Sequence, residues 1–199
     1  MNNKTRALLA ILTAILIAGC VGRSPTVRYY ELDALVRSEG ALGDTPAVAV
    51  GPVILPRVLD RPQMVIREGN SEIEIDEFHR WGSGLESEIV SALGQNLIGL
   101  LGTHRVAIYP TTESVPVQYR VLADFRDFVA DAGNEVLLSV QWMVEAERDG
   151  SALIVRESTI RKQAASSERS DIVTAHNEAL AELSREIAAA IQSTALSSP

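Results

Sequence analysis

Two long segments of the chain carry apolar residues at helical spacing. In the first, apolar side chains recur every three or four positions, at Leu85, Ile89, Leu93, Leu97 and Leu100. Positions three and four apart lie on one face of a helix, so this segment is expected to bury one side. The second segment runs from about residue 171 to residue 195 and repeats the pattern. Its stripe consists of Ile172, His176, Ala179, Leu180, Leu183, Ile187 and Ile191.

The first helix also carries signals for both of its ends. Ser83-Gly84-Leu85-Glu86 matches a capping box, in which the Ser83 side chain bonds the backbone amide three residues on and Glu86 reaches back. Gly102 stands just past the last periodic residue, where glycine commonly ends a helix. The sequence therefore predicts a helix that starts at Ser83.

Most of the remaining chain alternates between apolar and polar residues, as strands do. The clearest alternation runs from Val117 to Phe125, and it resumes from Val136 to Val144 after a turn at 131–134. Asp149-Gly150 then turns the chain into 153–160, so three antiparallel strands are predicted. Shorter strands are predicted at 27–32, at 47–55 with a bend at Gly51-Pro52, at 63–68 and 72–76 joined by a hairpin at Gly69-Asn70, and at 105–109, with a loop at 38–46.

These elements predict the fold class. Strands dominate, and each of the two helices has one apolar stripe to bury. Both helices are therefore expected to cover the same face of one sheet. The prediction is an α+β, two-layer domain with a largely antiparallel sheet and two amphipathic helices packed on one face.

The N-terminal residues indicate export and lipidation. Lys4 and Arg6 precede an apolar stretch, 7–18, that is shorter than the roughly 20 residues of a spanning helix. Ile17-Ala18-Gly19-Cys20 then looks like a lipobox, although an ordinary signal peptide with a chance cysteine is the alternative. Two or more acyl chains on Cys20 would give a stable anchor. We expect a signal peptide at 1–19, an acylated tether at 20–26 and a single periplasmic domain at 27–196.

Charge and cysteine content agree with this interpretation. Removal of the signal peptide takes away Lys4 and Arg6, and changes the formal net charge from −8 to −10. An acidic chain is unsuited to nucleic acid or to lying flat on anionic headgroups. Cys20 is the only cysteine, so no internal disulfide can form. Val21 follows it, and the absence of Asp at this position favours sorting to the outer membrane.

Candidate catalytic chemistry is sparse. The histidines at 79, 104 and 176 have no supporting motif or metal-ligand spacing, and His176 is expected in the core. Ser83 lacks a complete nucleophile elbow. Glu72, Glu74 and Asp76 share one strand face, which is best explained as a solvated face or a protected edge. The sequence predicts no enzyme, no metal site and no cofactor.

Segment 51–63 is unusual because three prolines stiffen it around an Asp60-Arg61 pair that is expected to be exposed. One interpretation is a rigid crossover that sets the path between two strands. The other is a surface that binds a partner. The nearby Trp81 is expected in the core because large aromatic side chains dominate core burial.

The chain resembles the PqiC/YmbA-type lipoproteins, the auxiliary lipoprotein components of ABC-type transport systems. The residues that carry the resemblance are the lipobox and the motifs Tyr29-Tyr30-Glu31-Leu32, Val50-Gly51-Pro52-Val53, Leu55-Pro56, Leu59-Asp60-Arg61-Pro62-Gln63 and Arg80-Trp81. This resemblance implies an outer-membrane lipoprotein that faces the periplasm and works with an MCE-domain tube protein and its inner-membrane transporter. It also implies a ring-shaped homo-oligomer.

Three functions remain to be compared. The first is a non-enzymatic docking component of an MCE-type ABC system that moves phospholipids between membranes. The second is a lipoprotein that helps to assemble or plug an outer-membrane β-barrel, and the third is an envelope hydrolase, disfavoured by the missing nucleophile. For the first, the candidate partner-binding residues are Pro56, Leu59, Asp60, Arg61, Pro62, Gln63 and Arg80.

Overall fold

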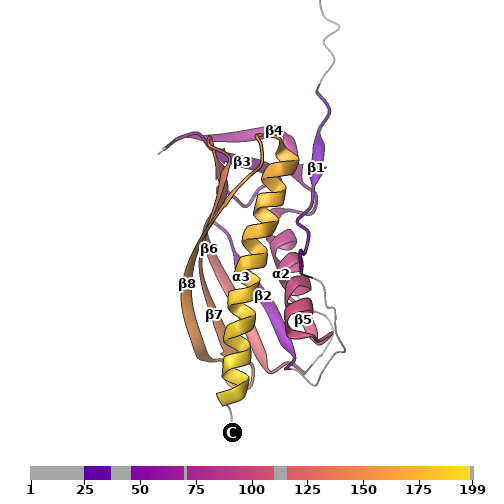
Figure 1. The fold of residues 1–199 in the computed structure, drawn as a ribbon, viewed down its shortest axis with the longest axis vertical. Coiled ribbons are helices and arrows are strands. Elements are labelled where there is room, and N and C mark those ends of the chain that lie inside the picture. Colours follow the sequence, from indigo (N-terminus) through magenta and orange to yellow (C-terminus); the bar gives the residue numbers. More distant parts are fainter. Residues whose placement is uncertain (1–24, 37–45, 70, 110–115, 198–199) are drawn as a thin grey trace, which may run out of the picture.

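The structure, a computed structural model, describes residues 25–36, 46–69, 71–109 and 116–197. In this part of the chain an eight-stranded sheet curls around two helices that lie side by side on one of its faces (Figure 1). This arrangement confirms the predicted α+β class. The elements are β1 (Arg28–Tyr30), β2 (Val48–Ile54), β3 (Gln63–Arg67), β4 (Ile73–Trp81), α2 (Leu85–Leu101), β5 (Val106–Ile108), β6 (Tyr119–Asp131), β7 (Glu135–Ala146), β8 (Ser151–Gln163) and α3 (Arg169–Ser197).

The sheet is organised around β6. On one side β6 pairs antiparallel with β7, which in turn pairs antiparallel with β8. On the other side β2 runs parallel to the first half of β6, and β3 pairs parallel with its last two residues. β5 extends the sheet beyond β2, while β4 and then β1 extend it beyond β3. β2 and β3 therefore succeed one another along the same edge of β6, with segment 55–62 between them.

The sheet is mixed. The three pairings between strands that are neighbours in the sequence, β3–β4, β6–β7 and β7–β8, are antiparallel and contain the longest ladders. The pairings β1–β4, β2–β5, β2–β6 and β3–β6 are parallel. Alternation predicts which residues form strands, but it contains no information on how strands far apart in the sequence pair, so the parallel pairings could not be foreseen.

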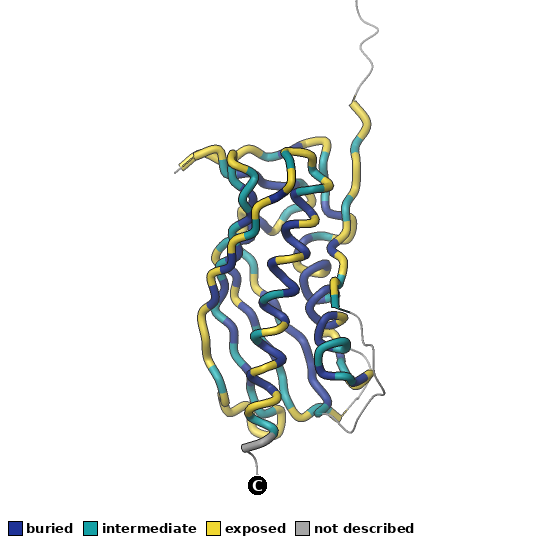
Figure 2. The backbone as a smooth tube through the Cα atoms, viewed as in Figure 1, coloured by how far each residue is buried: buried dark blue, intermediate teal, exposed yellow. Residues whose placement is uncertain are grey.

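The core lies between the sheet and the two helices (Figure 2). Every residue of the predicted second stripe is buried in α3, and the first stripe is buried in α2 except for the half-buried Leu100. On β7 the alternate residues from Val136 to Val144 are at most 1% exposed. Trp81 is buried as expected. Each large side chain in such a position stabilises the fold by about 1.5–3 kcal/mol.

The two ends of α2 differ from the prediction in one respect. Gly102 adopts the left-handed conformation, with φ 61°, and ends the helix as expected. The capping box is wrong: Gly84 is the N-cap residue and no side chain caps the helix. The carboxylate of Glu88 instead accepts hydrogen bonds from the backbone amides of Ser83 (2.8 Å) and Leu32 (3.1 Å). Glycine satisfies the positive φ of 86° at position 84, where serine would be strained.

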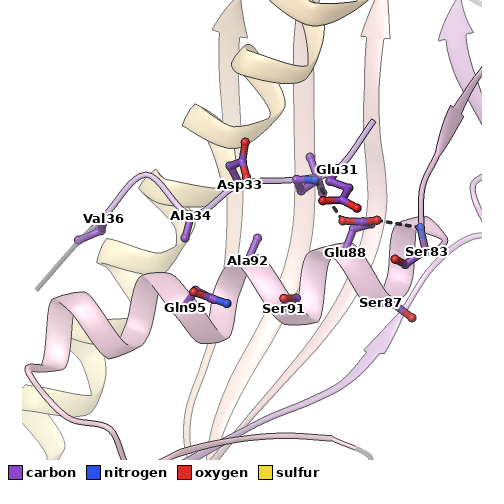
Figure 3. A pocket seen from close by; sticks show the side chains of 11 residues that line it. Glu31, Asp33, Ala34, Val36, Ser83, Ser87, Glu88, Ser91, Ala92 and Gln95 are labelled. Atoms are coloured by element: carbon purple, nitrogen blue, oxygen red, sulfur yellow. Dashed lines mark hydrogen bonds between the residues drawn. The ribbon is translucent and has the colours of Figure 1, made fainter. Parts of the chain in front are cut away.

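The extended segment that follows β1 is held to the helices by side chains (Figure 3). Glu88 accepts the amide of Leu32, Asn177 that of Asp33 and Asn96 that of Val36. These bonds replace the ladder that the segment would make in a sheet, because each backbone donor still needs a partner. The segment lies so close to α2 that a Cβ at Gly99 would come 2.8 Å from the carbonyl oxygen of Val36.

Candidate docking site at the start of α2

Segment 55–62 is a compact excursion from the edge of β6. The amides of Leu59 and Asp60 donate to the carbonyl of Pro56 at 2.8 and 3.1 Å, and the amide of Arg61 donates to the carbonyl of Leu59 at 2.8 Å. The side chain of Leu59 points into the core and is 3% exposed. Short backbone bonds and one buried anchor therefore fix the shape of the segment, as expected for a rigid crossover between two strands.

The same segment is joined to the end of β4. The amide of Trp81 donates to the carbonyl of Pro62 at 2.7 Å, and Gln63 lies opposite Arg80 in the β3–β4 register. The next amide, that of Gly82, donates to the carbonyl of Tyr30 in β1. Three pieces of chain that are distant in the sequence thus meet directly before α2 begins.

At this meeting point lies an open groove of about 540 Å³. It brings together four of the predicted partner-binding residues, Asp60, Arg61, Pro62 and Arg80. The remaining lining comes from Tyr29 and from residues 81–87, which include the first turn of α2. We call this feature the α2 groove. The crossover interpretation and the binding interpretation are therefore compatible, because the crossover forms one wall of the α2 groove.

The other three predicted residues do not line the α2 groove. Leu59 belongs to the hydrophobic core. Gln63 is half-buried, and its side-chain amide donates to Glu77 at 3.3 Å. Pro56 is half-buried at the start of the excursion, where its carbonyl accepts the two turn bonds. These three residues shape the segment rather than face the groove.

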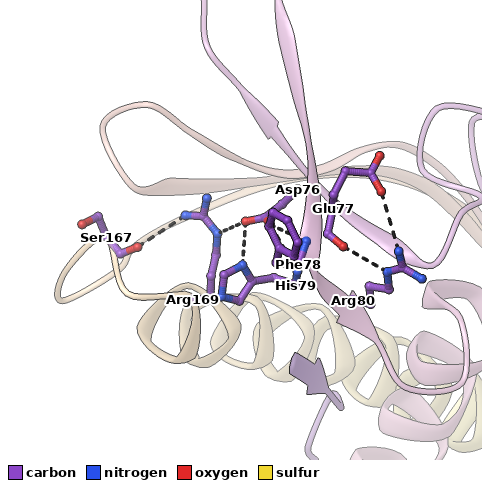
Figure 4. Close-up of polar contacts among 7 residues, drawn as sticks. All are labelled: Asp76, Glu77, Phe78, His79, Arg80, Ser167 and Arg169. Carbon is purple, nitrogen blue, oxygen red and sulfur yellow. Dashed lines mark hydrogen bonds and ion pairs between the residues drawn. The ribbon is translucent and has the colours of Figure 1, made fainter. Parts of the chain in front are cut away.

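Most charged side chains of the α2 groove keep hydrogen-bonding capacity that the described residues do not use. Asp60 is exposed, as predicted, but Arg61 is half-buried, which corrects the expectation of an exposed pair. The Nε atom of Arg61 is buried and has no hydrogen-bond partner among the described residues. Arg80 donates from Nε to the carbonyl of Glu77 at 3.2 Å and lies 3.6 Å from its carboxylate (Figure 4). A buried donor without a partner is costly, so it marks a place where a ligand could bind.

Sequence reasoning missed part of this site. Tyr29, whose side chain is 65% exposed, and the Gly82-Ser83-Gly84 turn line the α2 groove together with the first turn of α2. Two glycines around a serine directly before a helical stripe are a usable signal for an open helix start. The capping-box interpretation of Ser83 hid that signal.

Asp76 contradicts the prediction of a solvated acidic face. Glu72 and Glu74 are exposed, but Asp76 is buried and accepts hydrogen bonds from Arg169 of α3 at 2.9 Å and from the Phe78 amide at 3.1 Å, while His79 lies 2.8 Å away (Figure 4). Burial raises the pKa of Asp76, but these bonds outweigh it and hold that pKa below its usual value. This cluster fastens the start of α3 to β4.

The other two histidines considered for catalysis or metal binding lie in the core and at the surface. His176 is buried against Trp81 and Phe128, its Nδ1 donates to the carbonyl of Ile172 at 2.8 Å, and burial lowers its pKa to about 4. His104 is exposed. Within the described residues, no group of three or more His, Cys, Asp or Glu side chains could hold a metal ion.

The fold defines the class of protein as a two-layer α+β domain shared with solved structures. An uncharacterized protein, for which no organism is given, matches with a TM-score of 0.68 at 21% identity, over 83% of this chain and 99% of that chain. Protein XCC0632 from Xanthomonas campestris matches with a TM-score of 0.69 at 14% identity, over 81% of this chain and 93% of that chain. At these identities the likeness shows the fold alone.

The family follows from the sequence itself. The family model described as ABC-type transport auxiliary lipoprotein component matches residues 30–188, and the chain belongs to this family. The resemblance to PqiC/YmbA-type lipoproteins is thereby confirmed. No curated protein matches the chain. Among the described residues, no helix has the length and apolar character needed to cross a membrane.

Proposed function

We propose that this lipoprotein is a non-enzymatic docking component of an MCE-type ABC system that moves phospholipids between membranes. In this proposal acyl chains on Cys20 anchor it to the periplasmic face of the outer membrane, and the domain binds the MCE-domain tube protein of an inner-membrane transporter. Family membership supports the transport role. The α2 groove is the single structural observation that supports docking.

The α2 groove suits a docking role for a physical reason. Its walls are held by hydrogen bonds that the backbone carbonyls of Pro56, Pro62 and Tyr30 accept, so little conformational entropy is lost when a partner binds. Asp60, Arg61 and Arg80 supply both signs of charge at its surface. Charges arranged in this way select a partner and its orientation more than they add raw affinity.

Affinity purification of the full-length protein from crosslinked membranes tests this function. We expect an MCE-domain protein and its ABC transporter to copurify, and we expect Arg61→Ala to lose most of that material. Arg57→Ala is the matched control, because Arg57 is exposed in the same segment but does not line the α2 groove. Recovery of a β-barrel protein in place of an MCE-domain protein would assign the chain to barrel assembly instead, and recovery of neither would refute the proposal.

The site of anchoring has its own test. Val21→Asp is expected to move the protein from the outer-membrane to the inner-membrane fraction, and Cys20→Ala is expected to release it from membranes. Fractionation on a density gradient measures both. An outer-membrane position that Val21→Asp does not change would contradict sorting by the residue after the cysteine.

A ring-shaped homo-oligomer is part of the same proposal. Its support is that the described sheet ends in three strands, β1, β5 and β8, each of which pairs with one other strand, so identical chains can meet through two different edges. Contact between two different surfaces of identical chains closes into a ring when the rotation fits. Leu153 and Val155 on β8 are 41% and 52% exposed and are available for such a contact. Native mass spectrometry of the detergent-solubilised protein is expected to show one closed oligomer, and a monomer at all concentrations would contradict it.

A further inference from the structure

The positive half of the α2 groove presents hydrogen-bond donors of the kind that suit a phosphate. In the part of the chain that the structure describes, the buried Nε of Arg61 has no partner, and Arg80 bonds only to Glu77. The first turn of α2 lies in the same wall, and no side chain caps it. Guanidinium groups and free helix amides are the donors that proteins use for phosphate oxygens. The unsatisfied Arg61 Nε is the observation that distinguishes this helix start from an ordinary solvated one.

The acidic residues of the same groove restrict the chemical class of the ligand further. Asp60 and Glu86 are both exposed and both line it, and neither makes an ion pair within the described part of the chain. A simple anion would bind beside two carboxylates, while a simple cation would bind beside two guanidinium groups. A ligand that carries both charges on a short arm meets both sets of groups.

We infer that the α2 groove binds a phosphate ester that bears a short ammonium arm, as in phosphoethanolamine, with the phosphate at Arg61 and Arg80 and the ammonium at Asp60 and Glu86. The volume of about 540 Å³ is within the ordinary range for small-ligand sites, and it leaves room for the attached glycerol. The inference rests on the proposed function only for the expectation that phospholipid is present.

The position of the α2 groove agrees with a membrane source for this ligand. Tyr29 lines it and follows the predicted anchor Cys20 by nine residues, which can span at most about 30 Å. The groove can therefore reach the surface of the membrane in which the chain is anchored. A zwitterionic headgroup also avoids the repulsion that an anionic headgroup would meet on the anchored chain, whose formal net charge without the signal peptide is −10.

The test is a calorimetric titration of the full-length protein, in a maltoside detergent that contains no phosphate. The probe is sn-glycero-3-phosphoethanolamine. We expect saturable binding that Arg61→Gln weakens about ten-fold, the usual value of one charge-assisted hydrogen bond. Arg57→Gln, the matched control, is expected to bind like the wild type. Glu86→Gln is expected to weaken binding of this probe but not of sn-glycerol 3-phosphate, which lacks the ammonium.

Each other outcome has a defined meaning. No saturable binding, or equal binding by the wild type and Arg61→Gln, would overturn the inference. Tighter binding of sn-glycerol 3-phosphate than of the zwitterion would also overturn it, as would tighter binding of an acidic peptide, which would leave the groove to the docked protein of the proposed function alone. Binding to phosphatidylethanolamine nanodiscs, compared with binding of the free probe, separates a membrane source from a free one. Loss of the MCE-domain partner from the purification leaves this titration unaffected, so the two proposals fail separately.

Discussion

The two ends of this domain are built by different physical means. In the meander of β6, β7 and β8, covered by α3, apolar residues alternate along β6 and β7 and fill the core, and the Trp142 to Ser158 hydrogen bond is a buried polar contact within it. At the groove end, formed by β1, β3, β4, segment 55–62 and the first turn of α2, buried or half-buried polar groups join the pieces of chain. These include Glu88 and Asp76.

This difference assigns stability to the meander and recognition to the groove end. Apolar burial is non-directional and tolerates small shifts, whereas polar groups held by particular bonds define one geometry. The meander therefore supplies most of the free energy of folding. The groove end uses some of that free energy to keep the Nε atom of the half-buried Arg61 buried and without a partner among the described residues, as binding sites commonly do.

The largest expected effect comes from breaking the meander. Leu183 of α3 is 0% exposed, and Leu183→Ala is expected to lower the free energy of unfolding by about 3 kcal/mol through lost burial and a cavity. Glu178→Ala on the same helix is the control, with a change below about 0.5 kcal/mol because Glu178 is exposed. Urea denaturation measures both, and equal effects would contradict the assignment of stability to this core.

Acid is expected to act on the boundary between the two regions, where His176 packs against Trp81. Burial lowers the pKa of His176 from its ordinary value of 6.5 to about 4 in the folded protein, so the unfolded chain binds the extra proton first as the pH falls. Stability is therefore complete above pH 6.5 and decreases by about 2 kcal/mol on acidification to pH 5. His176→Leu should remove this decrease in the urea midpoint, and an unchanged pH dependence in that variant would count against the assignment.

A smaller loss is expected where a single carboxylate organises the groove end. Glu88 is buried and accepts two backbone amides, but Gln would offer only one oxygen and would place an amide donor against the other. Glu88→Gln should cost about 1–3 kcal/mol in thermal or urea unfolding. Glu86→Gln, two residues earlier on the exposed side of α2, should leave stability unchanged. A smaller loss for Glu88→Gln than for Glu86→Gln would show that this carboxylate is not structural.

The same division explains what could be predicted from the sequence. The stripes of α2 and α3, the strands of the meander and the turns at 131–134 and 149–150 follow from periodicity, because each residue's environment is set by its neighbours along the chain. The parallel pairings of β2 and β3 with β6 depend on segments far apart in the sequence. Local sequence patterns therefore do not predict these parallel pairings.

At the candidate site, local rules predicted the rigidity of segment 55–62 but not all of the contacts around it. Three prolines indicated a rigid element, and the structure places Asp60, Arg61, Pro62 and Arg80 around one groove. The capping-box rule failed because the carboxylate at the helix start belongs to Glu88, two residues after Glu86, which also has to hold Leu32, a requirement that only the tertiary fold creates. Asp76 was assigned to a solvated face for a similar reason, since its partner Arg169 lies in α3.

The smallest expected change in stability accompanies the largest change in docking. Asp60→Ala removes an exposed side chain that makes no ion pair within the described residues, so the free energy of unfolding should change by less than about 0.5 kcal/mol. Arg61→Ala also removes a buried donor that has no partner, and so costs little. Both variants are expected to lose copurification of the partner, or oligomerisation, while their urea midpoints stay near that of the wild type. Association like that of the wild type in both variants would show that segment 55–62 is a crossover and nothing more.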